Sequence, residues 1–377
     1  MKDLGLYIHI PFCESKCYYC DFYSVTNSSM DLKEKYIQAL VKELNFNIKN
    51  MNGFKFDTVF IGGGTPSIID VNHYKILFEF MKKNKLIKNN AEITMEVNPK
   101  SRGLDYLSKI KEIGVNRLSI GIQTFNDKIL KLIGRNHNKK EAEKFLRNST
   151  QAGFKNISCD LIFNLPLQRY HHIEKDISIL EKNNVKHISL YSLKVNPDTK
   201  MKSIVEKDPY RLMDEDEERA IYYKSRDLLS KKNYMQYEIS NFSIKDYESK
   251  HNLKYWNRQE YFGIGASAHS FINRRRFSNI SNVEKYIERI DKGVSALDFE
   301  EFIEKDELAW EYLILGLRKT EGISIRKFEN DCNTSIKIYK EKIRDLEKKG
   351  LVKFSEDRLK LTKKGMDLSN YVFVKLK

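Results

Sequence analysis

Long apolar runs are absent from this sequence. No stretch of 18 or more apolar residues occurs, so the sequence predicts no membrane-spanning helix. The first ten residues lack the basic, apolar and small-residue order of a signal peptide, and we expect no export signal there. Low-complexity tracts are also missing. With 377 residues, 41% of them hydrophobic, the chain can form one large domain and a small one.

Cysteine is scarce, and its few copies are grouped. Of five cysteines, three occur in one short stretch with the spacing C-x3-C-x2-C: Cys13, Cys17 and Cys20. Three thiols at such short spacing are a poor arrangement for disulfides. A chain with so few cysteines is typical of the reducing cytosol, which predicts a cytoplasmic protein. Cys159 and Cys332 stand alone, and we expect them to be buried or inert.

The three grouped thiols favour a soft metal or an iron–sulfur cluster. A structural zinc site usually has four ligands, and no fourth Cys or His follows at zinc-finger spacing. His9 lies upstream, on an expected strand. A zinc knuckle stays open as an alternative for this motif alone. Three cysteine ligands on a [4Fe–4S] cluster would leave one iron free for an outside ligand.

The chain is basic, with a formal net charge of +15. Its lysines are spread through helical segments, which indicates a solvated surface. The alternative is attraction to an acidic partner, an anionic membrane face or a porphyrin carrying propionates. A basic sheet with interleaved aromatic residues, which RNA binding would need, is not apparent, so we expect no nucleic-acid partner.

Strand and helix patterns alternate over the first 193 residues, which predicts parallel strands with helices outside them. About six such units are too few for a closed eight-stranded barrel. The expected strands are 4–10, 58–61, 91–97, 117–122, 157–163 and 187–193. The expected helices between them are 30–49, 70–81, 104–113, 139–152 and 173–182.

The second half has a different pattern. We expect a long helix over residues 214–232, a strand over 237–242 and a glycine-rich stretch over 261–270. Three more helices follow over 308–317, 325–328 and 336–346, and then a two-stranded wing over 351–354 and 359–361. The last part resembles a winged helix and is interpreted as a packing domain, with nucleic-acid binding as the alternative. The predicted domains are 1–200, 201–298 and 299–377.

Polar and glycine residues recur where the expected strands end. Gly63, Gly64 and Thr65 lie in GGGTP after the second strand, where a backbone without side chains lets a ligand approach, although a tight turn would look the same. Glu96, Gln123 and Asp160 belong to the third, fourth and fifth expected strands, and Arg135 lies in the loop after the fourth strand. Each alone could be a cap or a surface group, but barrel folds bind ligands at this end of their strands.

Residues 6–22, LYIHIPFCESKCYYCDF, closely resemble the cluster loop of radical S-adenosylmethionine (SAM) proteins. With GGGTP and HNLKYW, they resemble the branch that contains oxygen-independent coproporphyrinogen III oxidase and the heme chaperone HemW. The resemblance implies an open partial (β/α)6 barrel of α/β class and a smaller C-terminal winged-helix-like domain. It also implies a [4Fe–4S] cluster on the three grouped cysteines, with SAM on the free iron.

The family pattern assigns further roles. It implies a contact near the cluster for Tyr7, and SAM contacts for Gly63, Gly64, Thr65, Glu96, Gln123, Arg135 and Asp160. In HNLKYW, His251 could bind heme iron through an imidazole nitrogen, with Tyr255 and Trp256 as aromatic neighbours. A structural histidine is the alternative for His251.

Phe22 decides between the branches. The oxidases are expected to carry a fourth cysteine two residues after the third, and here Phe22 takes that place. The sequence therefore favours a heme chaperone that binds the cluster, SAM and heme and transfers heme to a client hemoprotein. The alternatives are radical oxidative decarboxylation of coproporphyrinogen III and, with little support, a zinc-bearing nucleic-acid binder.

Overall fold

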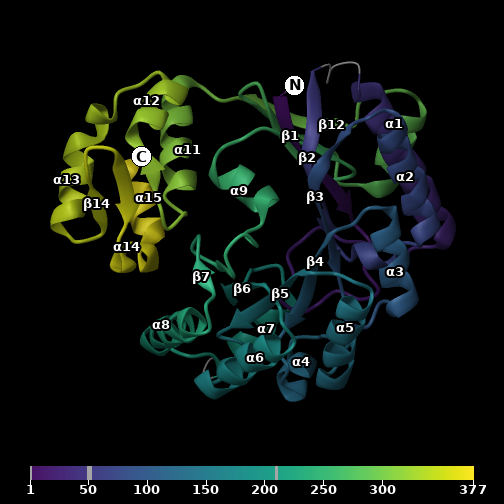
Figure 1. Ribbon diagram of the computed structural model, residues 1–377, viewed down its shortest axis with the longest axis horizontal. Coiled ribbons are helices and arrows are strands. Elements are labelled where there is room, and N and C mark those ends of the chain that lie inside the picture. Colours follow the sequence, from purple (N-terminus) through teal and green to yellow (C-terminus); the bar gives the residue numbers. More distant parts are fainter. Residues whose placement is uncertain (1, 49–52, 209–210) are drawn as a thin grey trace.

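Six parallel strands form the centre of the molecule and are hydrogen-bonded in chain order. The computed structural model describes residues 2–48, 53–208 and 211–377. The strands are β1 (Lys2–Ile10), β2 (Phe54–Gly63), β3 (Ile87–Val97), β4 (Arg117–Gln123), β5 (Asn156–Phe163) and β6 (His187–Ser192). Figure 1 shows them as an open arc, with the helices between them outside. The predicted open partial barrel is confirmed.

The covering helices are amphipathic and begin at residues that cap them. The Asp70 carboxylate accepts a hydrogen bond from the backbone of Asn72 at 2.9 Å, and Asn138 and Glu141 form a capping box. These helices are α1 (Met30–Ile48), α2 (Val71–Lys83), α3 (Leu104–Ile113), α4 (Asp127–Leu132), α5 (Lys139–Gln151) and α6 (Tyr170–Lys182). A short 3-10 helix, η2 (Pro66–Ile68), follows GGGTP. Helix α4 was not predicted, and the predicted end of the first helix at residue 49 lies outside the described residues.

Short strands extend this sheet on both sides to twelve strands. Beside β6 lie β8 (Asn241–Ser243) and β7 (Met235–Gln236); beside β1 lie β9 (Tyr261–Ile264), β10 (His269–Ile272), β11 (Arg275–Asn279) and β12 (Leu297–Phe302). The prediction of one strand over 237–242 is wrong. The Glu238 carboxylate accepts hydrogen bonds from the Ser240 backbone at 2.8 Å and the Asn241 amide at 2.6 Å, and this local bonding turns the chain between β7 and β8.

Four helices belong to the middle of the chain: α7 (Lys200–Lys207), α8 (Glu215–Lys231), α9 (Lys250–Trp256) and α10 (Val283–Asp291). Figure 1 shows α9 on the inner side of the arc, whereas the other helices of the barrel lie outside it. Its position brings the HNLKYW segment into the barrel interior.

The C-terminal part has its own apolar core and its own sheet, in the order β13 (Ile323–Ser324), β15 (Arg358–Leu361), β14 (Val352–Phe354). Its helices are α11 (Lys305–Gly316), α12 (Ile325–Cys332), α13 (Lys340–Lys348), α14 (Lys363–Asp367) and α15 (Ser369–Leu376). The predicted wing is confirmed, and β13 adds a third strand. The predicted helix over 336–346 is two elements, the 3-10 helix η4 (Ile336–Tyr339) and α13.

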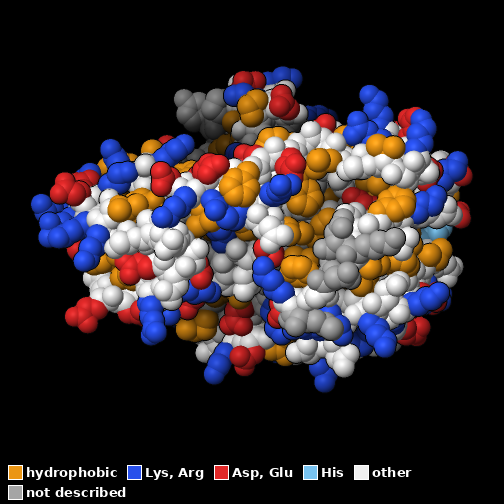
Figure 2. Space-filling model, turned by 90° about the horizontal axis from the view of Figure 1, so that it is seen from above, with side chains coloured by type: hydrophobic (Ala, Val, Ile, Leu, Met, Phe, Trp, Pro, Cys, Tyr) orange, Lys and Arg blue, Asp and Glu red, His pale blue; other side chains and the backbone are white. Residues whose placement is uncertain are grey.

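Surface and core agree with the composition. Figure 2 shows Lys and Arg side chains scattered over the face seen from above, with acidic side chains among them. Cys159 and Cys332 are buried, as predicted. Among the described residues, no helix combines the length and apolar character needed to cross a membrane.

Candidate cofactor site

A pocket at the carboxyl ends of β1 to β5 brings most of the predicted site residues together. It is lined by the three cysteines of the loop and by seven residues from the following strand ends: Cys13, Cys17, Cys20, Gly63, Gly64, Thr65, Glu96, Gln123, Arg135 and Asp160. Parallel strands end at one edge of the sheet, so residues nearly 150 positions apart meet there. Tyr7 and His251 instead line a separate cavity in the barrel interior, which shares Glu96 and Asp160 with the pocket.

Backbone hydrogen bonds hold the cysteine loop in place. The Cys13 amide donates to the Val25 carbonyl at 3.0 Å, and the Cys20 amide donates to the Cys17 carbonyl at 3.2 Å. The Cys13 sulfur lies 3.5 Å from the Thr65 hydroxyl. Burial raises the pKa of the Cys13 and Cys20 thiols, so metal binding here would release protons.

The donor set suits a cluster better than a single ion. Within residues 2–48, 53–208 and 211–377, no group of three His, Cys, Asp or Glu side chains is placed to hold one metal ion. A zinc site needs its ligands around one ion, whereas a four-iron cluster binds each thiolate to a different iron. The half-buried thiols facing one pocket therefore fit the cluster.

The glycine motif is hydrogen-bonded to the cysteine loop. The Gly64 amide donates to the Ile10 carbonyl at 2.8 Å, and the Thr65 amide donates to the Phe12 carbonyl at 2.8 Å. A Cβ on Gly64 would lie 2.6 Å from the Phe12 oxygen and 3.0 Å from the Cys13 sulfur. Only glycine allows this close approach of the two segments.

Glu96 is a half-buried carboxyl group with few partners. Its Oε2 accepts a hydrogen bond from the Gly63 amide at 3.1 Å. Burial and the nearby Asp160 carboxylate raise the pKa of Glu96 to about 8. A cationic ligand group would stabilise the ionised form and lower this pKa, so the site is suited to an ammonium or sulfonium group.

Arg135 brings a cation to the same pocket. Its Nη1 lies 3.5 Å from the Cys17 sulfur, and its Nη2 donates to the Asn98 side chain and the Gly121 carbonyl. Its Nε is buried and has no hydrogen-bond partner in the structure. A buried donor without a partner is costly, and a ligand carboxylate would satisfy it.

His251 is placed differently from what an exposed iron ligand requires. Its Nδ1 is hydrogen-bonded to the Thr58 hydroxyl at 2.8 Å, its Nε2 to the Tyr255 hydroxyl at 2.9 Å, and the residue is 1% exposed. Burial, followed by Lys254 and Arg117, lowers the pKa of His251 to about 3. Iron could bind either nitrogen only after one of these hydrogen bonds breaks.

The neighbours of His251 keep α9 against the first strands. The Glu92 carboxylate accepts the His251 amide at 3.1 Å, and Lys254 forms an ion pair with Asp57 at 2.8 Å. Asp57 lies in the amino-terminal half of β2 and Glu92 is the central residue of β3, so α9 packs against these strands away from the cysteine loop.

The comparisons with known proteins agree with this geometry. The radical SAM superfamily model matches residues 7–180, and the HemN C-terminal domain model matches residues 303–368. The chain is 37% identical over 372 residues to heme chaperone HemW of Bacillus subtilis (strain 168), covering 97% of both chains. The chain belongs to the heme chaperone HemW family. HemW of Lactococcus lactis is 35% identical, covering 99% of this chain and 97% of the relative.

A solved structure shows the same fold. Coproporphyrinogen III oxidase (HemN) from Escherichia coli, a radical SAM enzyme, superposes with a TM-score of 0.88 at 23% identity, covering 99% of this chain and 89% of HemN. The radical SAM family implies a [4Fe–4S] cluster and SAM. The half-buried thiols, the half-buried carboxyl group of Glu96 and the unpartnered Nε of Arg135 suit these two groups.

Sequence reasoning missed several residues of the site. Asn98 binds Arg135, Ser119 lines the pocket, and Arg117 is 2% exposed in the barrel interior with a buried Nε that has no partner. Asn98 directly follows β3, so its place at a strand end was a usable signal. Arg117 is the charged residue of β4, whose other residues are apolar except Ser119, Gly121 and Gln123, and a charge in this strand was a second signal.

Proposed function

We propose that this protein is a heme chaperone that binds a [4Fe–4S] cluster, SAM and heme and passes heme to a client hemoprotein. The observation that carries the proposal is similarity over nearly the whole chain to relatives named heme chaperone HemW. The convergence of three cysteines with Glu96 and Arg135 in one pocket supports the cofactor part.

In this proposal Cys13, Cys17 and Cys20 hold the cluster, which supplies electrons and one iron open to SAM. Glu96 and the Gly63–Gly64 backbone take the ammonium group, and the unpartnered Nε of Arg135 takes the carboxylate. Thr65, Gln123 and Asp160 make the remaining contacts to SAM, and Tyr7 makes a contact near the cluster. The closed backbone approach at Gly64 keeps the cluster loop beside the SAM site.

The heme part of the proposal has His251 as the ligand that the sequence indicates. Because both of its ring nitrogens are hydrogen-bonded, ligation requires the bond to Thr58 or the bond to Tyr255 to break. The proposal further includes a cytoplasmic location, contact of the basic surface with an anionic membrane, no nucleic-acid partner, and the domain limits 1–200, 201–298 and 299–377.

One alternative has a specific observation in its favour. The fold is shared with coproporphyrinogen III oxidase, so oxidative decarboxylation of coproporphyrinogen III is the second candidate. Phe22, which is 64% exposed and lines the cofactor pocket, disfavours it, because the oxidase branch is expected to carry cysteine there.

One preparation tests both functions. After anaerobic reconstitution, iron and sulfide are counted, SAM is added to the reduced cluster while its spectrum is recorded, and heme is titrated. We expect a four-iron cluster, a spectrum perturbed by SAM, near-stoichiometric heme binding and no decarboxylation of coproporphyrinogen III. Turnover of coproporphyrinogen without heme binding would replace the chaperone by the oxidase.

A further inference from the structure

The barrel interior contains a cavity of about 220 Å³ beside the cofactor pocket. We call it the inner cavity. Its lining comes from all six central strands, β1 to β6, and from α9. Glu96 and Asp160 line both the inner cavity and the cofactor pocket, so a ligand in the inner cavity would lie next to SAM.

The strand positions that face the inner cavity are polar. Every second residue of a strand faces the interior, and in closed barrels bulky apolar side chains fill these positions. Here β4 contributes Arg117 and Ser119, β5 contributes Ser158, and β6 contributes His187 and Ser189. Small hydroxyl side chains leave open the space that Val or Leu would fill, at the expense of apolar packing. The inner cavity is therefore suited to a polar occupant.

Arg117 brings a fixed positive charge to this cavity. Its side chain is 2% exposed, and its Nε is buried without a hydrogen-bond partner. Among the residues that the structure describes, no carboxylate lies within ion-pair distance of it. Arg102, which is less buried, donates to the carbonyls of Ser67 at 2.9 Å and Ile68 at 2.8 Å. A buried charge without a partner is strongly unfavourable, so Arg117 calls for an anion.

The other titratable groups around the inner cavity do not supply that anion. Burial lowers the pKa of His251 to about 3 and that of His187 well below its usual value, so both rings are neutral at pH 7. Burial raises the pKa of Glu96 to about 8 and also raises that of Asp160, where the charge of Arg117 offsets only part of the rise. Both carboxyl groups also face the proposed SAM site. The cationic groups of SAM would pair with them and leave Arg117 as the unmatched charge.

The size and charge of the inner cavity define the class of ligand. Its volume, about 220 Å³, lies below the range of about 300–1,000 Å³ that holds drug-sized ligands, so a porphyrin does not fit. Arginine binds a carboxylate or a phosphate through two parallel hydrogen bonds. A phosphate group carries nearly two negative charges at neutral pH, and a single arginine matches the one charge of a carboxylate better. The surrounding serine hydroxyls suit a ligand with a hydroxyl group of its own.

We propose that the inner cavity binds a small hydroxycarboxylate beside SAM, with its carboxylate on Arg117. This inference goes beyond heme transfer, and it rests on the SAM part of the proposed function. It applies to the conformation in which His251 keeps its hydrogen bonds to Thr58 and Tyr255, and it leaves the heme ligand as proposed above.

The test is a calorimetric titration of the reconstituted, SAM-loaded full-length protein at constant ionic strength. The probes are L-lactate and lactamide, its neutral amide. We expect lactate to bind at least tenfold more tightly than lactamide. Arg117→Met keeps a long side chain and removes the charge, so it should weaken lactate binding at least tenfold and leave lactamide binding within twofold. No lactate binding, equal binding of acid and amide, or lactate binding that Arg117→Met does not weaken would overturn the inference.

Arg275→Met is the matched control, because this side chain is 62% exposed and does not line the inner cavity. It should change lactate affinity less than twofold. Chemical denaturation separates a ligand-binding role of Arg117 from a structural one. Replacing a buried charge that has no partner by an apolar side chain should leave the unfolding midpoint of Arg117→Met at or above that of the wild type. A lower midpoint would make Arg117 a structural group and count against the inference.

The response of the reduced cluster to SAM is recorded on the same sample. A SAM response without lactate binding would overturn this inference and leave the proposed function standing. Lactate binding without a SAM response would support the inner cavity and overturn the cofactor part of the proposed function.

Discussion

Gly64→Ala tests whether the close approach of the glycine motif positions the cluster loop. The new Cβ would lie 2.6 Å from the Phe12 carbonyl oxygen, whereas ordinary contacts begin at 3.4 Å. The difference, 3.4 minus 2.6, means that the two segments must separate by about 0.8 Å. The obstacle is backbone, which cannot rotate away as a flexible side chain would.

This displacement has two measurable consequences. Overpacking of this kind costs about 1–3 kcal/mol in the free energy of unfolding. It also strains the hydrogen bond from the Gly64 amide to the Ile10 carbonyl, 2.8 Å long, and moves the Cys13 sulfur, which would lie 3.0 Å from the new methyl group. We therefore expect less iron per chain after anaerobic reconstitution and weaker perturbation of the reduced cluster by SAM.

The assay counts iron and sulfide and follows chemical denaturation of the cluster-free protein. Gly103→Ala is the matched control: no atom lies within 4 Å of its Cβ, and its φ is negative. At this helix N-cap the change costs at most about 1 kcal/mol and should leave cluster loading at the wild-type level. Full iron loading and an unchanged SAM response in Gly64→Ala would refute the argument.

Three further predictions concern the site. Replacing Cys13, Cys17 or Cys20 with Ala should abolish cluster absorbance after reconstitution, while Cys159→Ala should retain it; equal loss in both would refute the assignment. The pKa of Glu96 is about 8 when folded and near 4.5 when exposed, so unfolding free energy should fall as pH rises from about 4.5 to about 8. Denaturation of Glu96→Gln should lack this component, and an identical pH profile would contradict it. His251→Ala should cost about 2–4 kcal/mol in denaturation, because it leaves a cavity and orphans the Thr58 and Tyr255 hydroxyls; an unchanged midpoint would contradict the packing role.

The sequence alone determined the local features of this protein. The spacing of the three cysteines is local, so the thiol cluster could be recognised without a fold. The alternation of apolar strands and amphipathic helices predicted six parallel strands, and parallel strands necessarily end at one edge. That rule predicted that Glu96, Gln123 and Asp160 would meet, because it needs no knowledge of distant contacts.

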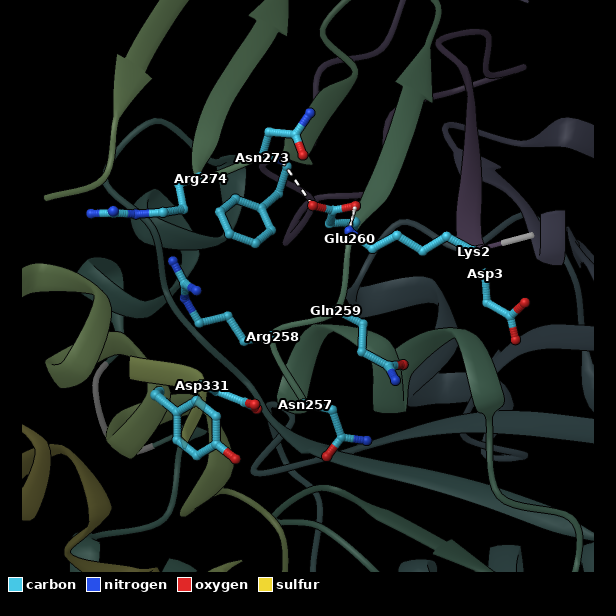
Figure 3. Close-up of a pocket in the computed structure, with 11 residues that line it drawn as sticks. Lys2, Asp3, Asn257, Arg258, Gln259, Glu260, Asn273, Arg274 and Asp331 are labelled. Carbon is cyan, nitrogen blue, oxygen red and sulfur yellow. Dashed lines mark hydrogen bonds and ion pairs between the residues drawn. The ribbon is translucent and has the colours of Figure 1, made fainter. Parts of the chain in front are cut away.

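Tertiary structure decided what depends on distant partners. The pattern around His251 is the same for an iron ligand and a buried histidine. Tyr255, one turn further along α9, bonds one nitrogen, and only the placement of α9 against Thr58 of β2 shows that the other is bonded too. The turn at Glu238 interrupts a strand pattern because a side chain competes with the sheet for backbone amides. Lys2, Arg274 and Tyr312 line one cavity between the barrel and the C-terminal part (Figure 3). No local pattern encodes their proximity, since it follows from how the C-terminal core packs beside the sheet.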